Sequence, residues 1–162
     1  MKIAILTGGG DAPGLNPVIR AVAKVAHENN VEMIGIKRGW AGLVELNHFP
    51  LKWKDVKNLH SEGGTFLLSS RTNPIKMENG IKIVSENLKQ VADGLIAMGG
   101  EDTLGVANEL YKNGVNVVGV PKTIDNDLFS TDYTIGFDTA INITVEAIDR
   151  IRSTGKSHER FM

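Results

Sequence analysis

The stretch IAILTGGGDAPGLNPVIRAVAKVA, residues 3–26, decides the fold. It opens with a short continuous apolar run, Ile3 to Leu6, typical of a strand that is covered on both faces. A glycine-crowded turn follows, and Asn16 and Pro17 then suit the N-cap and the first position of a helix. The helix shows one apolar stripe, made of Val18, Ala21, Val22, Val25 and Ala26. Strand, turn and helix in this order begin a β-α-β unit.

The rest of the chain repeats this alternation of apolar runs and amphipathic segments. Strands are predicted at 31–36, 94–98 and 115–120, and Pro121 should end the last of them. Helices are predicted at about 54–60, 79–91 and 139–152, and from Asp102 or Thr103 to Gly114. The last of these should bury Leu104, Ala107, Leu110 and Tyr111. Repeated β-α-β units predict an α/β fold, a three-layer Rossmann-like domain with a mostly parallel sheet between helices.

Composition narrows the class of protein. A chain of 162 residues suits one domain. Its 18 basic and 19 acidic side chains give almost no net charge, so no overall electrostatic attraction to nucleic acid or anionic membrane is expected. The absence of cysteine excludes disulfides, thiolate metal sites and a cysteine nucleophile. No stretch approaches the ~20 apolar residues of a membrane span, and the N-terminus does not resemble a signal peptide. We therefore expect a cytoplasmic protein.

Three polar or glycine-rich segments each follow a predicted strand, at 7–14, 99–103 and 122–127. In open parallel sheets, ligands bind beyond the carboxyl ends of the strands. These segments should therefore converge on one crevice.

The first segment, 7–14, is a strand-to-helix turn with four glycines. Its backbone N–H groups beside a helix N-terminus could bind a phosphate, although a tight structural turn would look the same. It matches neither the dinucleotide-binding fingerprint nor a Walker A loop.

The other two segments carry acids. Glu101 and Asp102 could hold a hard cation such as magnesium. Alternatively, Asp102 or Thr103 could cap a helix, with Glu101 favoured by the helix dipole. Asp125 and Asp127 could divide proton acceptance and metal binding between them, with Lys122 beside them for a phosphoryl oxygen. The alternative for this segment is a solvated Asp-Asn-Asp turn.

Two arginines could anchor phosphate through bidentate hydrogen bonds, Arg71 and Arg160. Solvated arginine is far commoner, so neither residue identifies a site by itself. His158 has no identifiable catalytic partner and fits a structural hydrogen bonder better than a base.

In combination these segments resemble the N-terminal half of a 6-phosphofructokinase. The resemblance rests on GGDAPGLN at 9–16 with Arg20, GGT at 63–65 with Arg71, GGED at 99–102, PKTIDND at 121–127, GFDTA at 136–140 and SHER at 157–160. Their order and spacing match across essentially the whole chain, and the first and fourth of them are highly diagnostic.

The resemblance implies transfer of a phosphoryl group to the 1-hydroxyl of fructose 6-phosphate, giving fructose 1,6-bisphosphate in glycolysis. The resemblance implies that Asp125 accepts the proton of the hydroxyl, that Asp127 assists in the metal and phosphate environment, and that Thr123 contacts the sugar phosphate. It implies that Gly10 contacts the donor phosphate, that Arg71 stabilises the transferring charge and that Glu101 is a Mg²⁺ ligand. Arg160 would contact the 6-phosphate across a subunit boundary.

Two positions bear on the phosphoryl donor. Members that use ATP usually have glycine after the acid of the GGE or GGD segment and glycine before TIDND, whereas here Asp102 and Lys122 stand there, as in pyrophosphate-dependent members. A carboxylate repels a nucleotide α-phosphate, and a lysine can neutralise leaving phosphate. Pyrophosphate is the expected donor, and ATP is the alternative.

The resemblance also implies that residues 1–162 form the donor-binding domain of a protein about twice as long. The family's second domain, which supplies further sugar-phosphate ligands, would then lie outside this chain, and the chain alone should be inactive. The full-length protein should form a dimer or tetramer. A non-catalytic phosphate-binding module is the competing hypothesis from another class.

Overall fold

The computed structural model describes residues 1–161 and contains one six-stranded sheet. Its strands are β1 (Lys2–Thr7), β2 (Glu32–Ile36), β3 (His48–Pro50), β4 (Gly94–Gly99), β5 (Val117–Thr123) and β6 (Ile135–Gly136). Its helices are α1 (Leu15–Glu28), α2 (Trp40–Val44), α3 (Trp53–Val56), α4 (Gly80–Val91), α5 (Glu101–Lys112) and α6 (Phe137–Ser157), with 3₁₀ turns η1 (Leu59–Ser61) and η2 (Pro74–Lys76).

The sheet has the order β3-β2-β1-β4-β5-β6 and is parallel except for the edge strand β3. The chain runs outward from β1 to β2 and β3, and then crosses to β4 on the other side of β1. The strand order therefore reverses between β1 and β4, which in open α/β sheets is where ligands bind. The predicted α/β fold with a mostly parallel sheet is confirmed.

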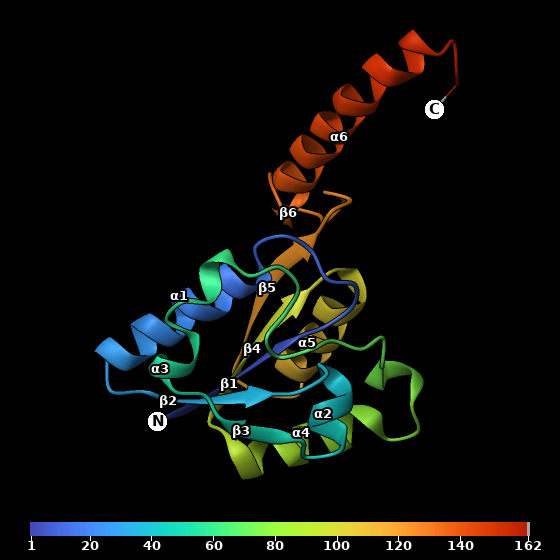
Figure 1. Cartoon of the computed structure of the whole chain (residues 1–162). Coiled ribbons are helices and arrows are strands. Elements are labelled where there is room, and N and C mark those ends of the chain that lie inside the picture. The colour runs from blue at the N-terminus through green and yellow to red at the C-terminus, as the bar shows by residue number, and fades with distance from the viewer. Residues whose placement is uncertain (162) are drawn as a thin grey trace.

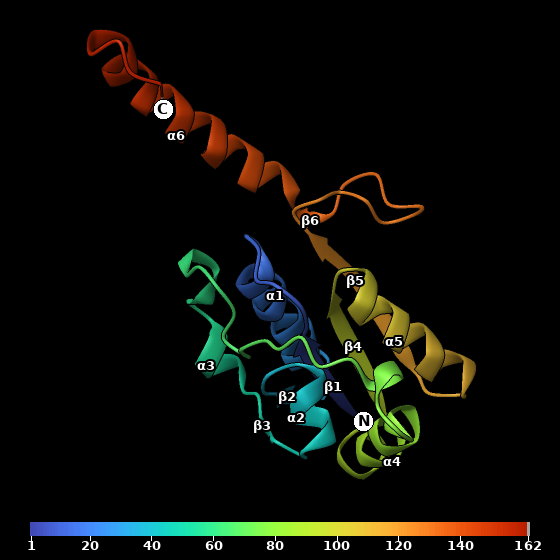
Figure 2. The same cartoon turned by 90° about the vertical axis from the view of Figure 1, so that its right-hand side faces the viewer.

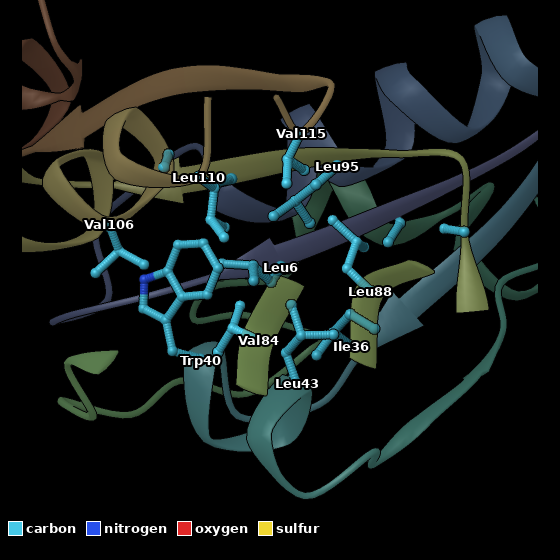
Figure 3. Close-up of a cluster of buried hydrophobic side chains, with 14 of the residues drawn as sticks. Leu6, Ile36, Trp40, Leu43, Val84, Leu88, Leu95, Val106, Leu110 and Val115 are labelled. Atoms are coloured by element: carbon cyan, nitrogen blue, oxygen red, sulfur yellow. The ribbon is translucent and has the colours of Figure 1, made fainter. Parts of the chain in front are cut away.

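Helices cover both faces of the sheet, so the body has three layers (Figure 1, Figure 2). One face packs against α2, α4 and α5, and Figure 3 shows this cluster with Trp40 among Leu6, Val84, Val106 and Leu110. The other face packs against α1, α3 and η1 through a second buried cluster that includes Ile5, Ile19 and Val56. Burial on both faces explains why the central strands are continuous apolar runs in the sequence.

Three local predictions were wrong. The N-cap of α1 is Gly14, with φ 94°, because the side chain of Asn16 instead hydrogen-bonds the backbone of Glu62, Gly63 and Phe66. Pro121 does not end β5 but pairs with Gly99 inside it. On its other side β5 pairs with β6 only from Lys122 onward, so proline stands at an open strand edge.

The third error concerns α5, where Tyr111 is 67% exposed and Val106 takes its predicted place in the core. Helix α6 also extends beyond the predicted range at both ends and projects away from the sheet (Figure 1, Figure 2). Among residues 1–161, no helix has the length and apolar character needed to cross a membrane.

Candidate active site

A cavity of about 820 Å³ lies at the carboxyl ends of β1, β4 and β5. Its walls come from four segments that are far apart in the sequence: 9–12, 70–75, 100–105 and 122–127. The predicted convergence of the three segments on one crevice is therefore confirmed, and the loop that carries Arg71 joins them. The cavity also lies beside the point where the strand order reverses, between β1 and β4.

Some backbone N–H groups of the glycine turn after β1 form hydrogen bonds within the protein. The N–H of Gly8 donates to the carbonyl of Met98 at 2.8 Å, and the N–H of Gly9 donates to the carbonyl of Ser70 at 3.0 Å. Gly9 has φ 77°, a conformation that favours glycine. At Gly10, no atom lies within 4 Å of the place where a Cβ would stand. The turn is thus fastened at Gly8 and Gly9 and open toward the cavity at Gly10.

Close packing at Thr103 brings α5 against this turn. Thr103 is 3% exposed, and a Cβ on either Gly8 or Gly99 would approach its side chain to 2.4 Å. The glycines therefore allow α5 to begin directly beside the end of β1. This places Glu101 and Asp102 in the first turn of α5 and on the cavity wall, where the helix dipole favours negative charge.

Helix capping does not explain these acids. The N-cap of α5 is Gly100, and within the described residues no side chain donates or accepts a capping hydrogen bond there. The carboxylate of Asp102 instead accepts a hydrogen bond from Asn73 at 2.9 Å. The capping alternative from the sequence was therefore wrong.

Lys122 is the buried cation of the site. It is 4% exposed, and its Nζ donates to the carbonyl of Gly10, so it links the end of β5 to the glycine turn. Burial lowers the pKa of Lys122 from its ordinary value, and the nearby carboxylates of Asp11 and Asp125 oppose this shift. The site thus holds a partly desolvated amine between two acids.

The segment after β5 is a hydrogen-bonded turn that carries two carboxylates, of which Asp125 is held by Thr123. Thr123 Oγ1 donates to Asp125 Oδ2 at 3.2 Å and accepts from the Asp125 N–H at 3.1 Å. Asn126 has φ 53°, and its Oδ1 accepts from the N–H of Thr134 at 2.9 Å. With Asn126 turned toward Thr134, Asp125 and Asp127 both line the cavity. The turn is held by hydrogen bonds of Thr123 and Asn126, whereas the side chains of Asp125 and Asp127 are exposed.

The loop that carries Arg71 is bound to the glycine turn along its length. Thr7 Oγ1 donates to the carbonyl of Leu68 at 2.8 Å, and Ser69 Oγ donates to the carbonyl of Gly9. Leu67, which directly precedes Leu68 and Ser69, is fully buried. These contacts bring Arg71 to the wall of the cavity that Glu101 and Asp102 also line.

Arg160 is the one predicted site residue that does not line this cavity. It follows the C-terminal end of α6, and its backbone N–H donates to the carbonyl of Gly155 at 2.9 Å. Because α6 projects from the body, a contact of Arg160 with a ligand in this cavity is not formed within the chain (Figure 1). The predicted contact across a subunit boundary remains a prediction.

The structure adds lining residues that the sequence did not single out as a site, among them Asp11, Ser70 and Asn73. Asp11 and Ser70 were visible as polar neighbours of predicted site residues. The contact between Asn73 and Asp102 spans 29 residues, and no local pattern indicates it.

The chemistry of the cavity suits a polyanion with a hard cation. Arg71 and Lys122 can neutralise phosphoryl oxygens, and the wall offers several carboxylates. Among the described residues no three His, Asp or Glu side chains gather into a preformed metal cluster. Mg²⁺ bound to phosphate typically takes only one or two carboxylates from the protein and keeps several waters, so the donor set fits such an ion.

Comparisons with a family model and with curated proteins point to the same family. The phosphofructokinase family model matches residues 2–162. The chain is 53% identical over 161 residues to a pyrophosphate–fructose 6-phosphate 1-phosphotransferase of Dictyoglomus thermophilum, covering 99% of this chain and 46% of that protein. It is 50% identical to the ATP-dependent 6-phosphofructokinase 1 of Thermus thermophilus, covering 98% of this chain and 50% of the relative.

Solved structures agree on the fold. Phosphofructokinase from Saccharomyces cerevisiae superposes with a TM-score of 0.83 at 31% identity, covering 97% of this chain and 24% of that one. A pyrophosphate-dependent phosphofructokinase from Nitrosospira multiformis has a TM-score of 0.82 at 18% identity, covering 96% of this chain and 42% of that one. The chain spans about half the length of the curated relatives it matches. This chain belongs to the phosphofructokinase family.

Proposed function

We propose that this chain is the donor-binding part of a phosphotransferase that moves a phosphoryl group from pyrophosphate to the 1-hydroxyl of fructose 6-phosphate. The observation that carries the proposal is the joint presence of Asp102, Lys122 and Asp125 around one cavity. Curated relatives at 52–55% identity are named pyrophosphate–fructose 6-phosphate 1-phosphotransferases, which supports the same activity.

Asp125 is the proposed general base. In the transfer, the 1-hydroxyl oxygen of the sugar attacks the phosphorus, its proton passes to the Asp125 carboxylate, and the P–O bond to the leaving phosphate breaks with its electron pair. The hydrogen bond from Thr123 Oγ1 orients this carboxylate. Phosphoryl transfer needs little covalent help from a protein, so positioning and charge neutralisation supply most of the acceleration.

The roles of the other site residues are proposed from the charge of each side chain and its position in the structure. We assign donor-phosphate contact to Gly10, whose surroundings are open, and charge neutralisation at the transferring and leaving phosphates to Arg71 and Lys122. Thr123 and Asp127 are assigned to the substrate side. Arg160 is assigned to the sugar 6-phosphate of a neighbouring subunit in a homo-oligomer, a dimer or tetramer.

Glu101 is the proposed protein ligand of Mg²⁺. When bound, the ion neutralises phosphoryl oxygens and orients the donor. The position of Glu101 in the first turn of α5 puts its carboxylate on the cavity wall without using it in a cap.

We further propose that residues 1–162 form the N-terminal domain of a longer protein whose second domain completes the sugar-phosphate site. The coverage of only about half of each curated relative supports this division. On this proposal the chain alone is inactive. The cytoplasmic location predicted from the sequence stays a prediction.

ATP is the second candidate donor, because relatives at 49–50% identity are named ATP-dependent 6-phosphofructokinases. The physical argument against it is local. A carboxylate at Asp102 repels the additional phosphate of a nucleotide, and Lys122 compensates a phosphate leaving group that carries no nucleoside.

The test is a coupled assay of the full-length protein with each donor. We expect strong turnover with pyrophosphate and little with ATP, and we expect the double variant Asp102→Gly with Lys122→Gly to lose pyrophosphate use in particular. The matched control removes one acid and one base outside the cavity, with Lys82→Ala and Glu86→Ala on α4. Strong activity with ATP and none with pyrophosphate would overturn the donor assignment.

A further inference from the structure

A hydrogen bond joins two walls of the cavity. Asn73 Nδ2 donates to Asp102 Oδ1 at 2.9 Å, and both residues line the cavity. Asn73 precedes η2, whereas Asp102 lies in the first turn of α5. The bond therefore fixes the carboxylate on one wall to an amide on the other.

The Asn73 end of this bond is rigid. Its Oδ1 accepts from the N–H of Ile75 at 3.0 Å, so the side-chain amide must present its nitrogen to Asp102. Its backbone carbonyl accepts from the N–H of Lys76 at 3.0 Å, and the next residue, Pro74, is buried and restricts the backbone. Asn73 is thus a preorganised donor.

The Asp102 end is mobile without this contact. Asp102 is exposed, and in the part of the chain that the structure describes the Asn73 amide is the one group that hydrogen-bonds its carboxylate. A free aspartate samples several rotamers and can turn its charge away from a polyanion that enters the cavity. Held by Asn73, the charge stays at one side of the cavity.

We infer that Asn73 determines donor specificity by positioning Asp102. This inference rests on the proposed pyrophosphate-dependent function. Fixed near η2, the carboxylate stands clear of a short donor and opposes a longer one that reaches that wall. Released, it can turn away from the longer donor, so that donor binds more easily and the discrimination between the two falls.

The test is the Asn73→Ser variant of the full-length protein, assayed for KM and kcat with pyrophosphate and for Ki of ATP as a competitor. Serine keeps an oxygen that can accept the Ile75 N–H but is too short to reach Asp102. A hydrogen bond to a charged group contributes enough for about a tenfold effect. We expect the ratio of Ki for ATP to KM for pyrophosphate to fall about tenfold, with kcat within about twofold of the wild type.

Two further variants separate positioning from general structure. Asn73→Ser in an Asp102→Gly background should change the ratio by less than about twofold, because the carboxylate to be positioned is gone. Asn58→Ser is the control, since Asn58 also stands directly before a 3₁₀ turn, η1, and does not line the cavity. It should leave both constants unchanged.

An unchanged ratio in Asn73→Ser would overturn the inference, and so would a fall of equal size in the Asp102→Gly background. In both cases a wild type that uses pyrophosphate leaves the proposed function intact. A wild type without pyrophosphate activity would overturn the proposed function together with this inference.

Discussion

The body of the molecule and helix α6 differ in how far they bury side chains of the same kinds. In the body, Leu110 on α5 is fully buried, and even Lys122 is only 4% exposed. On α6, large apolar side chains are exposed, with 48% at Ile141 and 54% at Ile148. Both helices are amphipathic, but only α5 has a partner for its apolar face within the described residues.

This difference shows what can be inferred from the periodicity of apolar residues in a helix. An apolar stripe indicates that a face is suited to be covered, and it does not indicate what covers it. For α5 the cover is the sheet. For α6 we propose the rest of a longer protein, because the curated relatives are about twice the length of this chain.

The largest expected contrast is in truncations to alanine, measured on residues 1–162 by denaturant unfolding followed by circular dichroism. Leu110→Ala should lower the free energy of unfolding by about 2–5 kcal/mol, because it opens a cavity in a packed core. Ile148→Ala should change it by less than about 0.5 kcal/mol, because the side chain is half exposed.

The full-length protein sharpens this contrast. If a second domain covers α6, Ile148→Ala should there cost more than about 1 kcal/mol. A cost as small as in the short chain would contradict the proposed cover.

The next effect concerns the buried lysine of the body. Because burial lowers the pKa of Lys122, the unfolded chain binds its proton more tightly than the folded one, and stability rises with pH between that lowered pKa and 10.5. Below this window the full penalty of burying the charged amine is present. Lys122→Met removes the penalty, so its stability relative to the wild type should be greatest at neutral pH and shrink toward pH 10.5.

Unfolding free energies of both proteins across this alkaline range give the measurement. Lys156→Met on α6 is the control, since this lysine is exposed. Parallel curves for Lys122→Met and the wild type would show that the lysine is not desolvated.

The smallest effect is on the exposed side of α6. Glu146 and Arg150 form an ion pair one helical turn apart, with 2.5 Å between Oε1 and Nη2. Such pairs stabilise a helix by only about 0.2–0.5 kcal/mol, so Arg150→Gln should lower the helix content of α6 slightly and leave the unfolding of the body unchanged. Raising the salt concentration should remove the difference. A larger loss would mean that Arg150 has a partner beyond this pair.

The sequence predicted those features that depend on local pattern. The central strands are apolar runs because both faces are covered, and the convergence of 7–14, 99–103 and 122–127 follows from their position after parallel strands. The edge strands β3 and β6 escaped prediction, since three and two residues are too few to show a period.

The remaining errors involve partners distant in the chain. Asn16 was predicted to cap α1 because its side chain suits that position, but its partners lie 46 to 50 residues away. The contact of Asn73 with Asp102 likewise joins residues 29 positions apart. Predicted site residues came together where strand ends dictate it, whereas the hydrogen bonds that orient them required the structure.

The most direct measurement is the turnover of the Asp125→Asn variant of the full-length protein with pyrophosphate and fructose 6-phosphate. The amide keeps the size of the side chain and can still accept from Thr123, but it cannot take the proton of the sugar hydroxyl. We expect kcat to fall by roughly two orders of magnitude or more, with KM for pyrophosphate little changed. A kcat within a few-fold of the wild type would contradict the assignment of this cavity as the active site.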